Sequence, residues 1–255
     1  MFVPTPPRIP PRHRPRGFTI VHEDAALLVV DKAHGVLTNS EHHDNTGTVE
    51  AGLNRYLRKG NPASRARVWV VHRLDRETSG LLVFAKTPAA QEQLKTQWET
   101  TRKFYLAVVH GRLAEKQGEL SSYLAEDADQ FVHTVAHRGV GKLARTGYTV
   151  IRETPALSAL RINLLTGRKN QIRVQFADLG HPVAGDPKYG VKDRFRARMA
   201  LHARTLSFPH PQGGHRVTFQ TPLPDYFLEL IHGLSDADWE KSNEKPSSDS
   251  GLNKR

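Results

Sequence analysis

Short apolar segments rich in β-branched and aromatic residues outnumber helical segments in this chain of 255 residues. Such segments predict strands. The clearest lie at residues 27–31, 68–71, 81–85, 104–109, 148–151, 157–165 and 217–219. Because these strands do not alternate regularly with helices, the sequence predicts an α+β fold with a mostly antiparallel, mixed central sheet and flanking helices.

Helical periodicity is confined to a few segments of the chain. Apolar residues at helical spacing predict a first helix that stops at Gly60, and Thr87 is a good N-cap for a second. Asn170 is the expected cap of a third helix, and a last helix is expected at about 225–234. The inward-facing residues of the first and third helices are expected to be Val49, Leu53, Leu57, Ile172, Phe176 and Leu179.

The charge balance favours a polyanionic partner. The chain has 37 Lys and Arg against 26 Asp and Glu, which gives a net charge of +11 and a pI near 10. A basic surface can simply be solvated, but a pI this high is typical of nucleic-acid binding. The absence of cysteine excludes disulfides and thiolate chemistry.

The ends of the chain differ in composition from its body. Residues 1–16 combine six prolines with four arginines and are expected to form a disordered basic arm, able to follow a phosphate backbone. Residues 17–240 are expected to form the folded domain, and residues 241–255 a disordered polar tail. No apolar run is long enough to span a membrane, and no secretory signal is visible. We therefore expect a cytoplasmic location without membrane contact.

The segment HRLDRETSG lies between the predicted strands 68–71 and 81–85 and contains one acid between two arginines. The plain interpretation is that Asp75 forms a surface ion pair with Arg73 or Arg76, which stabilises a protein little. The alternative is a catalytic carboxylate at the junction of a strand and a loop. Hydroxyls and backbone N–H groups of the following residues 78–80 favour the second interpretation.

A second unusual cluster, TGRKNQIRV, begins where the strand 157–165 ends. Arg168 and Lys169 precede a helix N-terminus, where the helix dipole disfavours positive charge unless an anion binds there. Arg173, next to the inward-facing Ile172, is expected to point along the edge of the core towards Asp75. The alternative is a solvated basic first turn.

A tyrosine in the predicted strand 104–109 is a further candidate. Tyr105 shares a strand face with Ala107 and Val109. It either packs in the core, as most strand tyrosines do, or presents its phenol to a cleft. The fourteen histidines show no metal-ligand spacing, and motifs for nucleotide hydrolysis, dinucleotide binding and serine esterases are absent from the sequence.

These segments together resemble the pseudouridine synthases of the RluA type, which isomerise uridines in ribosomal and transfer RNA. The resemblance covers about residues 18–222 and rests on HRLDRETSG, KFYLAVVHG, LVVDKAHGVL, GRKNQIRVQFADLGHPVAGDPKYG and LHARTLSFPHP. It implies the pseudouridine synthase fold with an RNA-binding cleft. It also implies Asp75 as the catalytic aspartate, Arg173 as its partner and Tyr105 as the active-site tyrosine. Arg73 would replace the flipped uridine, and no cofactor or metal would be required.

The resemblance also suggests which residues contact RNA. The candidates for RNA binding and base flipping are His72, Arg73, Arg76, Arg168, Lys169 and Gln171. The chain departs from the family at Ala33, where proline is usual, and at Lys169-Asn170, where Thr-His is common. The S4 RNA-binding domain that many relatives carry is expected to be absent.

Two other functions stay open at the level of sequence. One is an RNA-binding protein that has lost catalysis and acts in ribosome assembly, although Asp75, Tyr105 and Arg173 are all present. The other is a glycosidase, which would need two carboxylates at defined separation, and Glu77 is the only acid close to Asp75 in the sequence. The RNA, ribosomal or transfer, is not specified, and a monomer is the default expectation.

Overall fold

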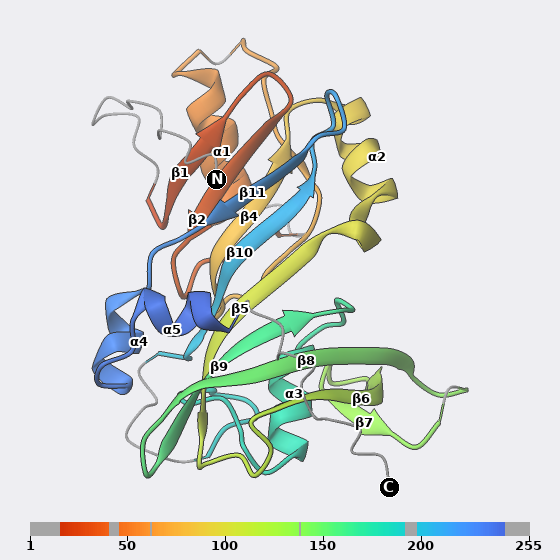
Figure 1. The fold of residues 1–255 in the computed structure, drawn as a ribbon. Coiled ribbons are helices and arrows are strands. Elements are labelled where there is room, and N and C mark those ends of the chain that lie inside the picture. Colours follow the sequence, from red (N-terminus) through yellow and green to blue (C-terminus); the bar gives the residue numbers. More distant parts are fainter. Residues whose placement is uncertain (1–15, 41–45, 62, 138, 192–197, 243–255) are drawn as a thin grey trace, which may run out of the picture.

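A computed structural model describes residues 16–40, 46–61, 63–137, 139–191 and 198–242. Within these residues eleven strands form one continuous sheet (Figure 1). The strands are β1 (Phe18–Glu23), β2 (Leu27–Lys32), β3 (Trp69–Val70), β4 (Ser79–Ala85), β5 (Arg102–His110), β6 (Gln117–Glu126), β7 (Val132–Val135), β8 (Lys142–Glu153), β9 (Leu157–Leu164), β10 (Leu201–Pro209) and β11 (Arg216–Gln220). The helices are α1 (Val49–Arg58), α2 (Pro88–Thr96), α3 (Gln171–Asp178), α4 (Asp225–Leu230) and α5 (Asp236–Lys241), with a 3-10 turn at Trp98–Thr100.

The strands run in the order β1-β2-β4-β10-β5-β9-β8-β6-β7, with β11 beside β10 and β3 beside β4. Only the β4–β10 pair is parallel among the described strand pairs. The predicted α+β class and mostly antiparallel mixed sheet are therefore confirmed. Figure 1 shows two lobes, one around β1, β2 and β4 and one around β6, β7, β8 and α3, with β5 passing between them.

The core is built on both faces of β4, all seven residues of which are buried. Leu82 and Phe84 face a cluster to which α1 contributes, whereas Leu81 and Val83 face a cluster that includes residues of α2. A strand covered on both faces has a continuous run of apolar residues rather than an alternation of apolar and polar residues. The alternation predicted for β5 is also confirmed, because Tyr105 and Leu106 belong to different clusters.

The seven predicted strand segments all contain strands, but β1, β6, β7 and β10 were not predicted. In β10 the buried charged and polar side chains of His202 and Arg204 interrupt the apolar pattern. In β6 most residues are exposed or only partly buried, so its apolar content is low. Strand pairing stabilises these segments through backbone hydrogen bonds that composition does not reveal.

The helix predictions need smaller corrections. Thr87 caps α2 as expected, since its side chain accepts the N–H of Ala90. The first helix ends one residue early, because Lys59 already adopts a left-handed conformation. Leu179 is 42% exposed and does not face inward. The last predicted helix is α4, which ends at Leu230, before Gly233 with its φ of 75°, and the following α5, which begins at Asp236, was not predicted.

The predicted arm 1–16 and tail 241–255 lie almost entirely outside the described residues, so both stay predictions. Each helix that the structure describes is too short or too polar to cross a lipid bilayer.

The parallel pair β4–β10 begins where the loop that carries Asp75 ends. Ser79 lies opposite His202 and Gly80 opposite Ala203, and the Ser79 hydroxyl is 2.8 Å from His202 Nδ1. Burial, followed by the charges of Arg198 and Arg204, lowers the pKa of His202 to about 3, so its ring is neutral near pH 7. Gly80 has a φ of 112°, and a Cβ there would lie 2.3 Å from the carbonyl oxygen of Ala203.

We expect Gly80→Ala to lower the free energy of unfolding by about 3 kcal/mol or more, because it combines an unfavourable φ with a clash against backbone. Urea unfolding measures the change. Gly47→Ala is the matched control, since a Cβ at Gly47 would meet nothing within 4 Å among the described residues beyond its chain neighbours. Equal stabilities of the two variants would contradict the close approach of β4 and β10.

Candidate active site

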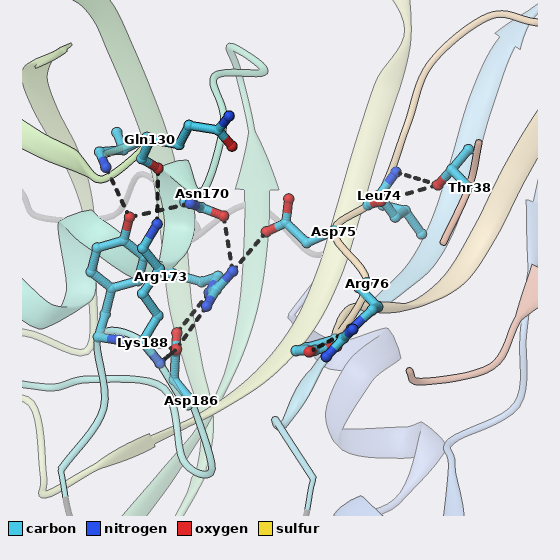
Figure 2. Close-up of polar contacts among 12 residues, drawn as sticks. Thr38, Leu74, Asp75, Arg76, Gln130, Asn170, Arg173, Asp186 and Lys188 are labelled. Carbon is cyan, nitrogen blue, oxygen red and sulfur yellow. Dashed lines mark hydrogen bonds and ion pairs between the residues drawn. The ribbon is translucent and has the colours of Figure 1, made fainter. Parts of the chain in front are cut away.

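The loop between β3 and β4 is held on both sides of Asp75. Leu74 inserts into the core, and its N–H donates to the Thr38 hydroxyl at 3.1 Å. The same hydroxyl donates to the Leu74 carbonyl at 3.0 Å (Figure 2). On the other side, the buried Lys32 ammonium donates to the Arg76 carbonyl at 3.1 Å. Asp75 therefore projects from a fixed backbone, with 30% of its side chain exposed.

Arg173 reaches Asp75 from the other lobe, as predicted. Its Nη1 donates to Asp75 Oδ2 at 3.1 Å, although 98 residues separate them in sequence. On its far side the guanidinium donates to both oxygens of Asp186, from Nε at 2.7 Å and from Nη2 at 2.8 Å. Figure 2 shows Arg173 between the two carboxylates. Bidentate pairing of this kind fixes the plane of the guanidinium.

Burial makes this ion pair a strong constraint. The Asp186 side chain is fully buried and that of Arg173 is 6% exposed. Burial alone would lower the pKa of Arg173, but the hydrogen bonds and charges of Asp186 and Asp75 raise it above its ordinary value. Burial alone would raise the pKa of Asp186, but Arg173 and two backbone N–H groups hold it below its ordinary value. Both groups are therefore charged at neutral pH.

Tyr105 lies on β5 beneath the same site and is 8% exposed. Burial, and to a smaller extent the charge of Asp75, raise the pKa of its phenol above the ordinary value. The phenol is therefore protonated at neutral pH, so it can donate a hydrogen bond or order a water. It combines the two interpretations open from sequence, because it packs in the core and also lines a cavity.

A pocket of about 260 Å³ brings the predicted residues together. Its lining includes Asp75, Tyr105, Arg173, Arg73, His72, Arg168 and Gln171. A neighbouring groove shares Arg73, Asp75 and Arg168 with this pocket and adds Lys169. The structure thus unites residues from three distant segments of the chain. Arg76 is the exception among the candidates, since it lines neither cavity and pairs with Glu77 at 3.1 Å.

Two of the candidates have structural contacts that use their polar atoms. His72 Nε2 accepts the N–H of Val83 at 3.1 Å, and its ring lies 4.5 Å from that of Trp98. Burial, then the charge of Lys103, lowers the pKa of His72 to about 3, so it is neutral. Gln171 is 2% exposed.

The amide of Gln171 ties the turn before α3 to β8. Its Oε1 accepts the Arg168 N–H at 3.0 Å, and its Nε2 donates to the Arg145 carbonyl at 3.0 Å and the Thr146 hydroxyl at 2.8 Å. The bond to its N–H fixes the backbone of Arg168. The side chains of Arg168, Lys169 and Arg73 are exposed. Each of these three lines at least one of the two cavities, although Lys169 also pairs with Glu126. Contacts of the six candidates with RNA stay predictions.

Sequence reasoning missed Asp186, Lys103 and the role of Asn170. Asn170 precedes α3 but does not cap it, because its φ is 54° and its side chain accepts no N–H of the helix. Instead its Oδ1 accepts from Arg173 Nη1 at 2.8 Å. Lys103 lines the pocket, with its Nζ 5.6 Å from the ring centre of Trp98. Asp186 follows the apolar stretch before it in GHPVAGDPKYG, but no local pattern connects it to Arg173.

Among the residues that the structure describes, no group of three or more His, Cys, Asp or Glu side chains is arranged to hold a metal ion. The side chains at this site offer a partly exposed carboxylate, an arginine that holds it, and a buried phenol on the pocket wall.

A family model described as RNA pseudouridylate synthase matches residues 26–178. The chain belongs to this family. It is 36% identical over 234 residues to the ribosomal large subunit pseudouridine synthase D of Neisseria meningitidis, covering 86% of this chain and 62% of that relative. It is also 36% identical to the uncharacterized RNA pseudouridine synthase YlyB of Bacillus subtilis, covering 91% of this chain and 78% of the relative.

Solved structures of the family have the same fold. Human RNA pseudouridylate synthase domain containing 1 superposes with a TM-score of 0.68 at 25% identity, covering 91% of this chain and 97% of that one. Human RNA pseudouridylate synthase domain containing 4 gives a TM-score of 0.69 at 21% identity, with 84% and 91% covered. The predicted family and the predicted pseudouridine synthase fold are confirmed. The chain spans 62% of the length of the Neisseria relative.

We expect Asp186→Asn to lower the free energy of unfolding by about 3–5 kcal/mol, because it leaves the buried guanidinium of Arg173 without its bidentate partner. Urea unfolding at pH 7 measures this loss. Glu119→Gln is the control, since it breaks an exposed pair with Arg145 and is expected to change stability little. If the two variants were equally stable, the buried pair would not be the constraint described above.

Proposed function

We propose that this chain is an RNA pseudouridine synthase in which Asp75 is the catalytic carboxylate. The observation that carries the proposal is the partly exposed carboxylate in a pocket, held at 3.1 Å by an arginine that is itself buried. Family membership gives the reaction. The N1–C1′ bond of a uridine breaks, C5 bonds to C1′, the C5 proton leaves and N1 gains a proton, so no redox partner is consumed.

The pocket suits the steps that this isomerisation requires. A uridine stacked in RNA must leave its stack at a cost of a few kcal/mol. Arg73 and Arg168 line both the pocket and the neighbouring groove, so Arg168 can hold a phosphate while Arg73 fills the vacated space. The net charge of +11 adds a sequence-independent attraction to the RNA backbone.

Asp75 acts as a carboxylate paired with Arg173. The carboxylate either attacks C1′ or removes the C2′ proton to give a glycal, and both routes need the geometry described here. The protonated phenol of Tyr105 stacks beside the freed uracil while the ring turns. At the end of the reaction the phenol orders the proton acceptor, either a water or a neighbouring group, which receives the C5 proton.

We further propose ribosomal RNA of the large subunit as the substrate class. Relatives from four organisms carry the name ribosomal large subunit pseudouridine synthase D, at 34–37% identity. Such a substrate would place the enzyme in the cytoplasm, and it is proposed to act as a monomer. Pseudouridine mapping of total RNA from a deletion strain tests the substrate. A missing ribosomal site that the wild-type gene restores would support it, and a missing transfer-RNA site would contradict it.

We expect Asp75→Asn to fold and bind RNA as the wild type does but to lower turnover at least about 1,000-fold, which corresponds to about 4 kcal/mol. The amide keeps the shape of the carboxylate but is neither a nucleophile nor a base. Release of tritium from C5-labelled RNA measures turnover. Asp225→Asn, at the exposed start of α4, is the control and should retain full activity. Residual activity of Asp75→Asn within tenfold of wild type would refute the assignment.

We expect Tyr105→Phe to bind RNA normally and to lower kcat about 100-fold, because the ring still stacks but the phenol oxygen is lost. Single-turnover tritium release and filter binding separate the two effects. A kcat equal to that of the wild type would show that Tyr105 serves only as a stacking surface.

A further inference from the structure

Asn170 is the residue immediately before α3, and its backbone is left-handed, with a φ of 54°. Asparagine tolerates this conformation better than most residues. Its side chain does not cap the helix but turns towards Arg173, as Figure 2 shows. Asn170 is 8% exposed and lines the same pocket as Asp75. A buried amide in this position needs partners for both of its polar atoms.

The partners of Asn170 connect it to the catalytic pair. Arg173 Nη1 has two hydrogens, one of which goes to Asp75 Oδ2 at 3.1 Å and the other to Asn170 Oδ1 at 2.8 Å. Because Nη1 can only donate, the amide oxygen of Asn170 must face it, which fixes the orientation of the amide. Nδ2 then donates to the Tyr189 hydroxyl at 3.2 Å.

Tyr189 holds Asn170 and also contacts Arg173. Its hydroxyl accepts a second hydrogen bond, from the N–H of Val132 at the start of β7, at 3.1 Å. Its ring centre lies 5.2 Å from the central carbon of the guanidinium. Tyr189 therefore anchors the amide to the β6–β7 hairpin of the lobe that contains α3.

We propose that Asn170 is a positioning residue that keeps Nη1 of Arg173 directed at Asp75 during catalysis. The inference rests on the proposed function. Either route for Asp75 removes its negative charge for part of the cycle, through a bond to C1′ or a proton from C2′. Its attraction for Arg173 then falls, while Asp186 still holds only Nε and Nη2. The neutral oxygen of Asn170 retains Nη1 without competing as a charge, so the carboxylate regains its partner when it is released.

Asn170→Gly tests this role, because glycine keeps the left-handed backbone and removes only the side chain. We expect kcat to fall about tenfold or more, with KM within about twofold of wild type, since the interaction matters after RNA is bound. Asn61→Gly, in an exposed loop, is the control and should leave both constants unchanged. An unchanged kcat, or a loss confined to KM, would overturn the proposal.

A further variant separates positioning from a merely structural role. Tyr189→Phe keeps the ring over Arg173 but releases the amide. Its loss of kcat should add little to that of Asn170→Gly in the double variant, and full additivity would contradict the connection.

These results are distinguishable from a failure of the proposed function. If the wild-type chain released no tritium from any C5-labelled RNA, the proposed function would fail. If the wild type turned over and Asn170→Gly matched it, only the role of Asn170 would fail.

Discussion

The buried ion pair between Arg173 and Asp186 is the interaction on which the site depends. Both side chains are removed from water, so each needs the other, and removal of either partner would leave an uncompensated buried charge. Their bidentate geometry fixes the plane of the guanidinium and leaves Nη1 directed at the pocket. That single nitrogen then holds both Asp75 and Asn170. A surface pair could not impose such an orientation, because solvent and side-chain entropy weaken it.

The sheet places the two halves of this contact opposite each other. Asp75 belongs to the lobe of β2 and β4, and Arg173 to the lobe of β8 and α3, so this ion pair spans the joint between them (Figure 2). On the first side the loop is fixed by Thr38, Lys32 and the close approach of Gly80 to β10. On the second side Gln171 ties the start of α3 to β8. Gln171, which the family resemblance suggested as an RNA contact, thus helps to hold the shape of the pocket.

Local sequence was a reliable guide where a pattern reports directly on one element. The run of β4, the alternation of β5, the cap at Thr87 and the direction of Arg173 from the helix face all agree with the structure. It failed where distant partners satisfy polar groups. His202 and Arg204 interrupt the apolar pattern of β10, so the strand was not predicted, and their partners lie elsewhere in the chain. Asn170 has the position of a helix cap, but its side chain binds Arg173. Propensity and capping rules describe neighbours in sequence, and these residues respond to neighbours in space.

The sequence by itself determined the α+β class and the family, and it identified Asp75, Tyr105 and Arg173 as candidate active-site residues. Those properties follow from sequence patterns of a few residues, or from motifs that keep their order along the chain. Only the tertiary structure decided that Asp186 lies behind Arg173, that Arg76 lines neither cavity, and that the side-chain amide of Gln171 makes hydrogen bonds within the protein. The physical reason is that a buried charge or amide loses its contacts with water and must find partners within the protein. Those partners come from strands and loops that meet only when the sheet has formed.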